Sequence, residues 1–134
     1  MRQYKRVWVY CRTAYPDAEA LERQKQMLLH AADKQGFQVV GITAESGSGL
    51  SLERQGIKEL LTAVDNKQMD IVFVKDASRI ARNFIELWNC VERLETHGIE
   101  VLTLDDGFLE KPWANPYMQI AKARKHFVGL PQIN

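Results

Sequence analysis

The sequence V-F-V-K-D-A-S-R-I-A-R-N at residues 72–83 combines a fold signal with a chemical one. The apolar run at 71–74 predicts a buried strand, and a polar turn follows it. Arg79 and Arg82 come next, three residues apart, so a helical segment would place both guanidiniums on one face. A guanidinium can bond two oxygens of a phosphate at once. The stretch therefore indicates either an oxyanion site past a strand end or a solvated helix start with two surface arginines.

Strand-like and helix-like segments alternate on both sides of this stretch. Asp17 is a good N-cap for the first helix, and Gly36 and Gly98 are placed to end helices. Predicted strands cover residues 6–11, 37–43, 70–75 and 100–104, and predicted helices cover about 18–34, a segment capped at or beside Ser51, and a segment from 84 to Gly98. The order predicts an α/β fold of three layers, with a mainly parallel central sheet and helices on both faces.

Composition narrows the class of protein. A length of 134 residues with 46% apolar residues suits a single globular domain. Lys and Arg number 18 against 17 Asp and Glu, so bulk charge cannot hold a nucleic acid and any such contact needs a local basic cluster. Cys11 and Cys90 lack zinc-site spacing, which favours reduced thiols in a cytoplasmic protein. No run is long and apolar enough for a membrane span, and no cofactor motif stands out.

Four polar segments are expected at one edge of the sheet, because ligands of open parallel sheets bind beyond the carboxyl ends of the strands. They are residues 12–15, 45–54, 75–82 and 105–107, of which 44–52 reads as a mobile Gly and Ser loop. The arginines of these segments are Arg12, Arg54, Arg79 and Arg82. Four arginines at one rim predict a phosphodiester site, and structural ion pairs to Asp76, Asp105 or Glu45 are the alternative.

A different class of site uses the acidic residues of the same rim. Asp76, Asp105 and Asp106 follow strand ends, where carboxylates can hold a magnesium ion for phosphate chemistry. Four arginines would compete with that ion for the phosphate. We therefore predict no metal site, and a magnesium titration separates the two readings.

Several motifs in order resemble the catalytic domain of the serine recombinases, the resolvase and invertase family. They are Y-C-R-T-A at 10–14, L-E-R-Q at 21–24, S-G-S-G with L-E-R-Q-G at 46–56, V-K-D-A-S-R-I-A-R-N at 74–83 and L-D-D-G at 104–107. The resemblance covers about residues 5–108. It implies a resolvase-like domain that acts on DNA as a homodimer or tetramer, in DNA recombination, integration and strand exchange of mobile elements.

The resemblance also assigns roles to single residues. In the family a serine attacks the scissile phosphate, and arginines hold that phosphate. By motif position Arg12, Arg54, Arg79 and Arg82 match the family's active-site arginines, and Gln24 matches a supporting polar residue. Ser78 stands where many members have aspartate and would be a further phosphate contact.

The nucleophile position departs from the family pattern. The signature Y-x-R-x-S has its serine two residues after the arginine, where this chain has Ala14. A methyl group cannot attack phosphorus, because nucleophilic catalysis needs an activatable oxygen or sulfur. Thr13, Ser46 and Ser48 are the substitute nucleophiles that the sequence offers.

The C-terminal segment is the second departure. Residues 1–110 correspond to the catalytic domain, and 111–134 are predicted to form a helical tail, with a helix at 117–128 in which Arg124 is a candidate for a further family arginine. No segment resembles a DNA-binding domain. The sequence thus leaves two functions open: a recombinase with an unrecognised nucleophile, and a non-catalytic regulatory or oligomerisation subunit derived from one.

Overall fold

Five strands and three α-helices make up residues 5–109, the part of the chain that the computed structural model describes. They are β1 (Arg6–Thr13), α1 (Ala18–Gln35), β2 (Gln38–Ser46), α2 (Gln55–Asp65), β3 (Ile71–Val74), the short 3₁₀ helix η1 (Ala77–Arg79), α3 (Phe84–Thr96), β4 (Glu100–Thr103) and β5 (Gly107–Phe108).

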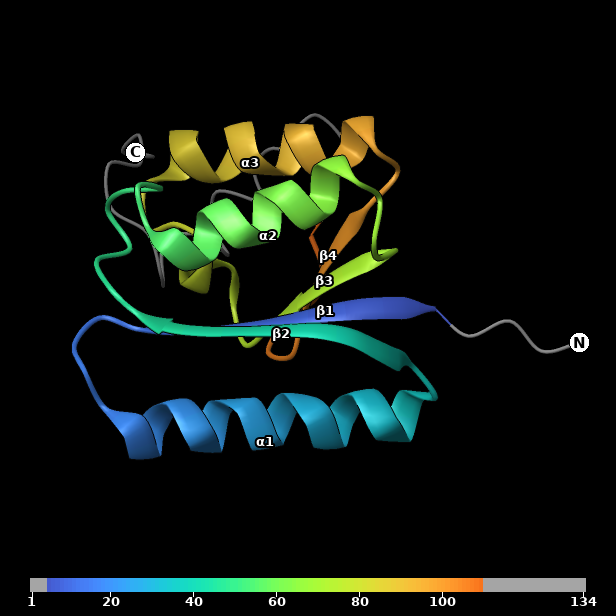
Figure 1. The fold of residues 1–134 in the computed structure, drawn as a ribbon, viewed down its shortest axis with the longest axis horizontal. Coiled ribbons are helices and arrows are strands. Elements are labelled where there is room, and N and C mark those ends of the chain that lie inside the picture. The colour runs from blue at the N-terminus through green and yellow to red at the C-terminus, as the bar shows by residue number, and fades with distance from the viewer. Residues whose placement is uncertain (1–4, 110–134) are drawn as a thin grey trace, which may run out of the picture.

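The sheet has the strand order β2-β1-β3-β4-β5, and its pairs are parallel except for β4 with β5. Helix α1 covers one face, and α2 and α3 cover the other (Figure 1). The predicted three-layer α/β fold with a mainly parallel sheet is therefore confirmed. The crossovers bring all four parallel strands to the same edge with their carboxyl ends.

Two apolar clusters join the layers, and β1 contributes to both. Val9 and Cys11 belong to the cluster that includes Leu28 of α1, whereas Tyr10 belongs to the cluster that includes Leu60 of α2. Neighbouring residues of a strand point to opposite faces, which explains the division. Arg12 continues the Tyr10 face, so its guanidinium enters the layer between the sheet and α2.

The predicted helix ends are confirmed at three positions. The Asp17 side chain accepts a hydrogen bond from the Ala20 N–H at 2.9 Å, as an N-cap does. Gly36 and Gly98 have φ of 74° and 72° just past their helices. Left-handed backbone of this kind costs a residue with a Cβ more than it costs glycine.

The β2 to α2 connection differs from the prediction. Strand β2 runs three residues past its predicted end, through Ser46, because β1 also continues and pairs Thr13 with Ser46. Helix α2 begins at Gln55 with Arg54 as its N-cap residue, so the predicted cap at or beside Ser51 is wrong. The Glu45 carboxylate replaces a local cap by accepting from the Gly56 N–H at 2.8 Å. A cap that comes from a strand, and not from the residues before the helix, leaves no signal in the sequence next to the helix.

Strand β5 was not predicted. It is two residues long, pairs antiparallel with β4 and follows a turn closed at Gly107, whose φ is 78°. Two residues are too few to show a period. The predicted tail helix at 117–128, with Arg124, and the boundary at 110–111 lie outside the described residues.

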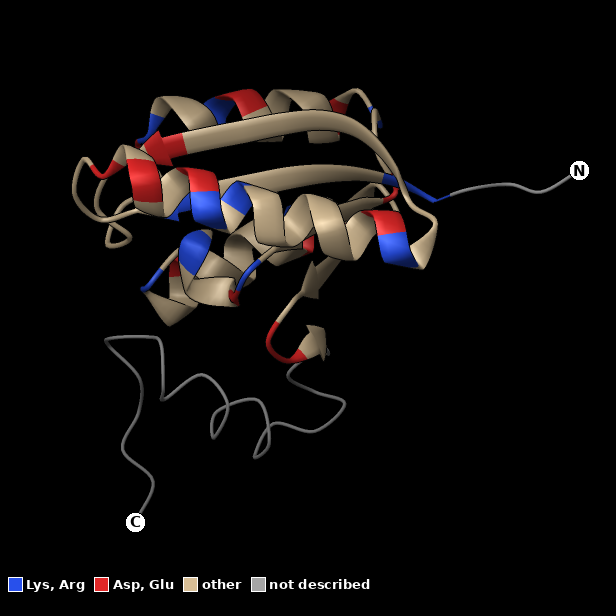
Figure 2. Cartoon of the chain, turned by 90° about the horizontal axis from the view of Figure 1, so that it is seen from below, with Lys and Arg blue, Asp and Glu red and all other residues tan. Residues whose placement is uncertain are grey.

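Helix α1 carries acidic and basic residues interspersed along its solvent side (Figure 2). Glu22 and Lys25 form an ion pair there at 2.9 Å. This mixed surface provides no continuous basic patch. Within residues 5–109, no helix combines the length and apolar character needed to cross a membrane.

Candidate functional site

A cavity of about 340 Å³ opens at the carboxyl edge of the sheet. Five of the seven candidate residues line it, together with Lys75 and Asp76; the five are Arg12, Ala14, Ser78, Arg79 and Arg82. The remaining two, Gln24 and Arg54, are buried beside the cavity and hydrogen-bond to residues that line it. The fold therefore assembles the candidate residues from four separate segments at one place.

Arg12 is the buried cation of the cavity, with 2% of its surface exposed. Its guanidinium donates to three backbone carbonyls, those of Gly47 at 2.8 Å, Ser78 at 2.8 Å and Arg79 at 2.9 Å. It forms no ion pair with any carboxylate of residues 5–109. Burial lowers the pKa of Arg12, and the neighbouring Arg54 charge lowers it further. The positive charge of Arg12 is thus stabilised by carbonyl dipoles. No carboxylate of residues 5–109 neutralises it.

Gln24 fixes the backbone at Arg12. Its side-chain oxygen accepts from the Arg12 N–H at 3.0 Å, and its side-chain nitrogen donates to the Arg12 carbonyl at 3.2 Å. The pairing of β1 with β3 ends at Val9 with Phe73, so the backbone groups of Arg12 have no strand partner on that side. A buried glutamine of α1 takes the place of the missing strand.

Arg54 is buried in a polar network on the other side of the cavity wall. Its Nε lies 3.2 Å from the Tyr10 hydroxyl and 3.5 Å from Glu45 Oε2, and the Tyr10 hydroxyl donates to the same Glu45 oxygen. Burial raises the pKa of Tyr10, and the hydrogen bond to Glu45 adds to the rise, so this phenol stays protonated. The ion pair with Glu45, one of the predicted structural alternatives, is thus present for Arg54.

The Arg54 guanidinium also reaches backbone carbonyls. Its Nη1 donates to the carbonyls of Ser48 and Ser51, both at 2.6 Å, and its Nη2 donates to that of Ile80. Sequence reasoning placed Glu45 at the rim but missed Tyr10 as part of the site. Tyr10 lies on the same strand face as Arg12, two residues before it, and this spacing is the signal that could have identified it.

The turn after β3 is organised by Asp76. Its carboxylate accepts from the Ser78 N–H at 3.0 Å, from the Ser78 hydroxyl and from Arg79 Nε at 3.3 Å. Arg79 Nη1 also donates to the Arg12 carbonyl at 3.0 Å. The 3₁₀ helix ends at Arg79, so the predicted shared helix face of Arg79 and Arg82 is wrong, although both side chains line the cavity.

Arg82 is the exposed arginine of the set. It forms no ion pair with the residues that the structure describes, whereas Lys75 on the same rim is paired with Asp105 at 3.1 Å. Across residues 5–109, no three His, Cys, Asp or Glu side chains are grouped closely enough to hold a metal ion. Three carboxylates of the rim have basic or hydroxyl partners: Glu45 with Arg54 and Tyr10, Asp76 with Arg79 and Ser78, and Asp105 with Lys75.

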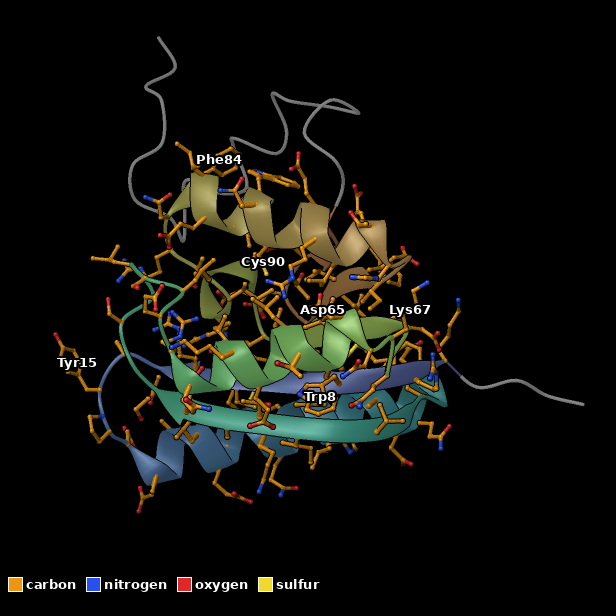
Figure 3. The ribbon with its side chains drawn as sticks, turned by 45° about the horizontal axis from the view of Figure 1, so that its top comes forward. Trp8, Tyr15, Asp65, Lys67, Phe84 and Cys90 are labelled. Atoms are coloured by element: carbon orange, nitrogen blue, oxygen red, sulfur yellow. The ribbon has the colours of Figure 1, made fainter. Side chains whose placement is uncertain are left out.

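Ala14 lies on the cavity wall, in the loop after β1. The next residue, Tyr15, is 81% exposed and projects away from the molecule (Figure 3). Of the substitute nucleophiles, Thr13 Oγ1 bonds to Ser46 Oγ at 3.0 Å and to the Tyr15 carbonyl at 2.8 Å. Neither these two residues nor Ser48 is among the described residues that line the cavity. Ser78 is the lining residue that carries a hydroxyl.

Comparison with known proteins gives one family. The model of the resolvase N-terminal domain matches residues 7–128 of this chain. A resolvase of Clostridium perfringens (strain 13 / Type A) is 28% identical over 102 residues, which cover 75% of this chain and 50% of that protein. The chain thus spans about half the length of the curated relatives it matches.

Solved structures show the same fold. The N-terminal catalytic domain of TP901-1 integrase superposes with a TM-score of 0.73 at 23% identity, covering 90% of this chain and 94% of that one. A resolvase family site-specific recombinase from Streptococcus pneumoniae has a TM-score of 0.72 at 21% identity, with 90% and 88% covered. The catalytic domain of ISC1926 TnpA, an IS607-like serine recombinase, has a TM-score of 0.70 at 24% identity, with 87% and 79% covered.

Proposed function

This chain belongs to the resolvase N-terminal domain family of serine recombinases, and on that premise we propose that it binds the phosphodiester backbone of DNA in the arginine-lined cavity without cleaving it. The phosphate first contacts Arg79 and Arg82. The buried positive charge of Arg12 balances the negative charge of the phosphate. The chain then acts as a non-catalytic regulatory or oligomerisation subunit beside a complete recombinase. Assembly as a homodimer or tetramer and a cytoplasmic location are parts of this proposal.

The buried charge of Arg12 carries the proposal. A cation with 2% exposure and no carboxylate partner among residues 5–109 is costly unless an anion is bound beside it. The pKa of Arg12 is lowered by its burial and then by the charges of Arg54, Arg79 and Arg82, which all repel it. A phosphodiester in the adjoining cavity supplies one negative charge and oxygens for the planar donors.

Loss of cleavage follows from Ala14. Strand cleavage needs a bond between a protein oxygen and phosphorus while the bond to the leaving sugar oxygen breaks, and alanine has no lone pair to form it. The cavity beside Ala14 is lined by arginines and a lysine that can still bind the phosphate. Binding and cleavage are therefore separable in this chain.

An active recombinase is the second candidate, and one contact favours it. Ser78 is a lining residue of the cavity, and its hydroxyl donates to the buried Asp76 carboxylate, the pairing of a hydroxyl with a base that activated nucleophiles use. In this alternative the Ser78 oxygen attacks phosphorus, its proton passes to Asp76, and the bond to the leaving sugar oxygen breaks. That oxygen leaves as a hydroxyl by taking a proton from water.

A covalent-trapping assay on supercoiled plasmid separates the two functions. The native chain, Ala14→Ser and Ser78→Ala are each fused to a DNA-binding domain of known site, which supplies affinity, and adducts are detected after denaturation. We expect an adduct from Ala14→Ser alone. An adduct from the native chain that Ser78→Ala abolishes would establish the second candidate. No adduct from any of the three would contradict a cleavage-competent scaffold, and binding would have to be measured by itself.

A further inference from the structure

Residues 47–51, here named the strap, form the first part of the connection from β2 to α2 and contact the arginines of the site. Three of its backbone carbonyls accept from arginine side chains: that of Gly47 from Arg12, and those of Ser48 and Ser51 from Arg54. A fourth, that of Gly49, accepts from the Arg82 backbone N–H at 2.5 Å. Four of the five backbone carbonyls of the strap, which lies within the predicted loop at 44–52, therefore accept hydrogen bonds.

The same two guanidiniums hold the turn after β3. Arg12 donates to the carbonyls of Ser78 and Arg79, and Arg54 donates to that of Ile80. Arg12 and Arg54 therefore cross-link the strap to the turn. All of these acceptors are neutral carbonyls, which bind a guanidinium less strongly than an anionic oxygen does.

Glycines allow the strap to lie this close. A Cβ at Gly49 would come within 2.5 Å of Arg82 Cγ and within 2.7 Å of Arg12 Nη2. A Cβ at Gly47 would come within 2.9 Å of Arg54 Cδ. Neither glycine has a φ in the left-handed region, so a substitution there tests proximity and leaves backbone strain aside.

We infer that the strap is an autoinhibitory gate over the phosphate site, and this inference rests on the proposed function. With the strap closed, the donors of Arg12 and Arg54 are occupied by carbonyls, and only Arg79 and Arg82 meet an incoming phosphate. A phosphodiester that enters fully replaces the carbonyls as the acceptor and releases the strap. Binding is weakened by the fraction of molecules that are closed, so opening the strap raises the apparent affinity.

The Arg82 amide reports the state of the gate in the native chain. Its N–H is bonded to the Gly49 carbonyl of the strap, and release of the strap exposes that N–H to water. Hydrogen exchange of this amide is followed by NMR during titration with dimethyl phosphate, the simplest phosphodiester. We expect exchange at Arg82 to speed up as the ligand saturates. The amide of Leu28, inside α1, is the internal control and is expected to stay protected.

Gly49→Ala tests the gate by opening the strap without a ligand. When the strap is closed, the added methyl group clashes with the side chains of Arg82 and Arg12. We therefore expect dimethyl phosphate to bind roughly fivefold or more tightly, the scale of an ordinary conformational coupling. Leu50→Ser is the matched control, because Leu50 is 54% exposed and its side chain takes no part in the arginine contacts. Its affinity is expected to equal that of the native chain.

The outcomes separate failure of the gate from failure of the site. If dimethyl phosphate binds while Arg82 exchange is unchanged and Gly49→Ala binds no more tightly, the phosphate site stands and the gate is refuted. If neither the native chain nor Gly49→Ala binds the ligand, both the site and the gate are refuted. Thermal unfolding of Gly49→Ala shows whether it folds, and the native exchange result decides the question when it does not.

Discussion

Two arginines of the site are interior parts of the protein, and two border open solvent. Arg12 and Arg54 are 2% and 7% exposed and hold the strap and the turn through backbone carbonyls. The Arg79 side chain is 25% exposed, and Arg82 is exposed and unpaired with any described carboxylate. The four arginines match motifs of one family, but two of them hold the fold together and two are placed where a ligand can reach them.

The difference lies in what surrounds each guanidinium. Arg54 has a carboxylate, a phenol and carbonyls around it, which together offset the cost of its burial. Arg12 has carbonyls only. Arg82 keeps its solvation and its donors, so it can bind a ligand at little cost. We expect substitutions of Arg12 and Arg54 to affect folding first and substitution of the exposed Arg82 to affect binding first.

Arg54→Ala should have the largest effect. It leaves the Glu45 carboxylate, 14% exposed, without its cation and removes the donors that hold Ser48 and Ser51. We expect a loss of about 3–5 kcal/mol in the free energy of unfolding, measured by urea denaturation. Arg82→Ala is the matched control and is expected to change it by less than about 0.5 kcal/mol. Equal losses for the two variants would remove the distinction between interior and solvent arginines.

Gln24→Leu should follow in size. The apolar side chain fills the same space but leaves the Arg12 N–H and carbonyl without the glutamine. An unsatisfied buried backbone group costs about 1–3 kcal/mol, and we expect a loss in that range. Gln26→Leu, on the exposed side of α1, is the comparison and should cost far less. If Gln24→Leu left the free energy of unfolding unchanged, the end of β1 would be held by the sheet alone.

Arg82→Gln should reduce affinity for dimethyl phosphate without affecting the fold. Loss of one hydrogen bond to a charged group corresponds to roughly tenfold weaker binding, or about 1.4 kcal/mol. Lys58→Gln, which removes one positive charge from the outer surface of α2, serves as the charge-matched control. Equal weakening by both changes would show that overall charge, and not the cavity, holds the phosphate.

Arg6 is a second arginine of β1, and unlike Arg12 it has a carboxylate partner; changes at this pair should have the smallest effect. Arg6 Nη2 lies 3.1 Å from Asp70 at the opposite end of the sheet, and both side chains are about 40% exposed. Hydrogen bonds from Arg6 lower the pKa of Asp70. The pair therefore contributes stability above the ordinary Asp pKa of about 3.9, and this contribution disappears as the pH falls through the lowered value.

Asp70→Asn should flatten that acid dependence. We expect a loss of less than about 1 kcal/mol near neutral pH, since solvent screens an exposed pair, and no loss at a pH below the folded pKa. Urea denaturation across the acid range measures the difference. A constant loss at every pH would assign the effect to packing or to the backbone hydrogen bond of Arg6, and not to charge.

Local signals predicted the elements well. Asp17 marks a helix start because its side chain accepts a backbone hydrogen bond, and Gly36 and Gly98 mark helix ends because glycine, without a Cβ, adopts left-handed backbone at low cost. The spacing of apolar residues predicted the helices of both layers. The sequence also identified which segments meet at the carboxyl edge, because parallel strands connected by helices bring those ends together. The predicted fold class was right for these reasons.

Non-local contacts account for the misses. Glu45 of a neighbouring strand caps α2, and Thr13 lengthens β2 by pairing with Ser46. In both cases the cause lies in another part of the sequence, so the residues next to the helix or strand give no sign of it. The predicted loop at residues 44–52 was wrong at its start, because residues 44–46 belong to β2, and the hydrogen bonds of residues 47–51 were not foreseen. Arg54, which holds the carbonyls of Ser48 and Ser51, is near in sequence, but Arg12 and Arg82 lie 35 and 33 residues from Gly47 and Gly49, the residues that they hold.

Residue type and spacing were enough to predict the order of strands and helices, the four arginines at one edge of the sheet and the lack of a hydroxyl at Ala14. Which of the arginines are buried could be seen only in the folded chain. Burial and hydrogen-bond partners depend on how β2, the strap and the turn after β3 pack around each guanidinium. The same charge is therefore a structural link at Arg54 and an open donor at Arg82.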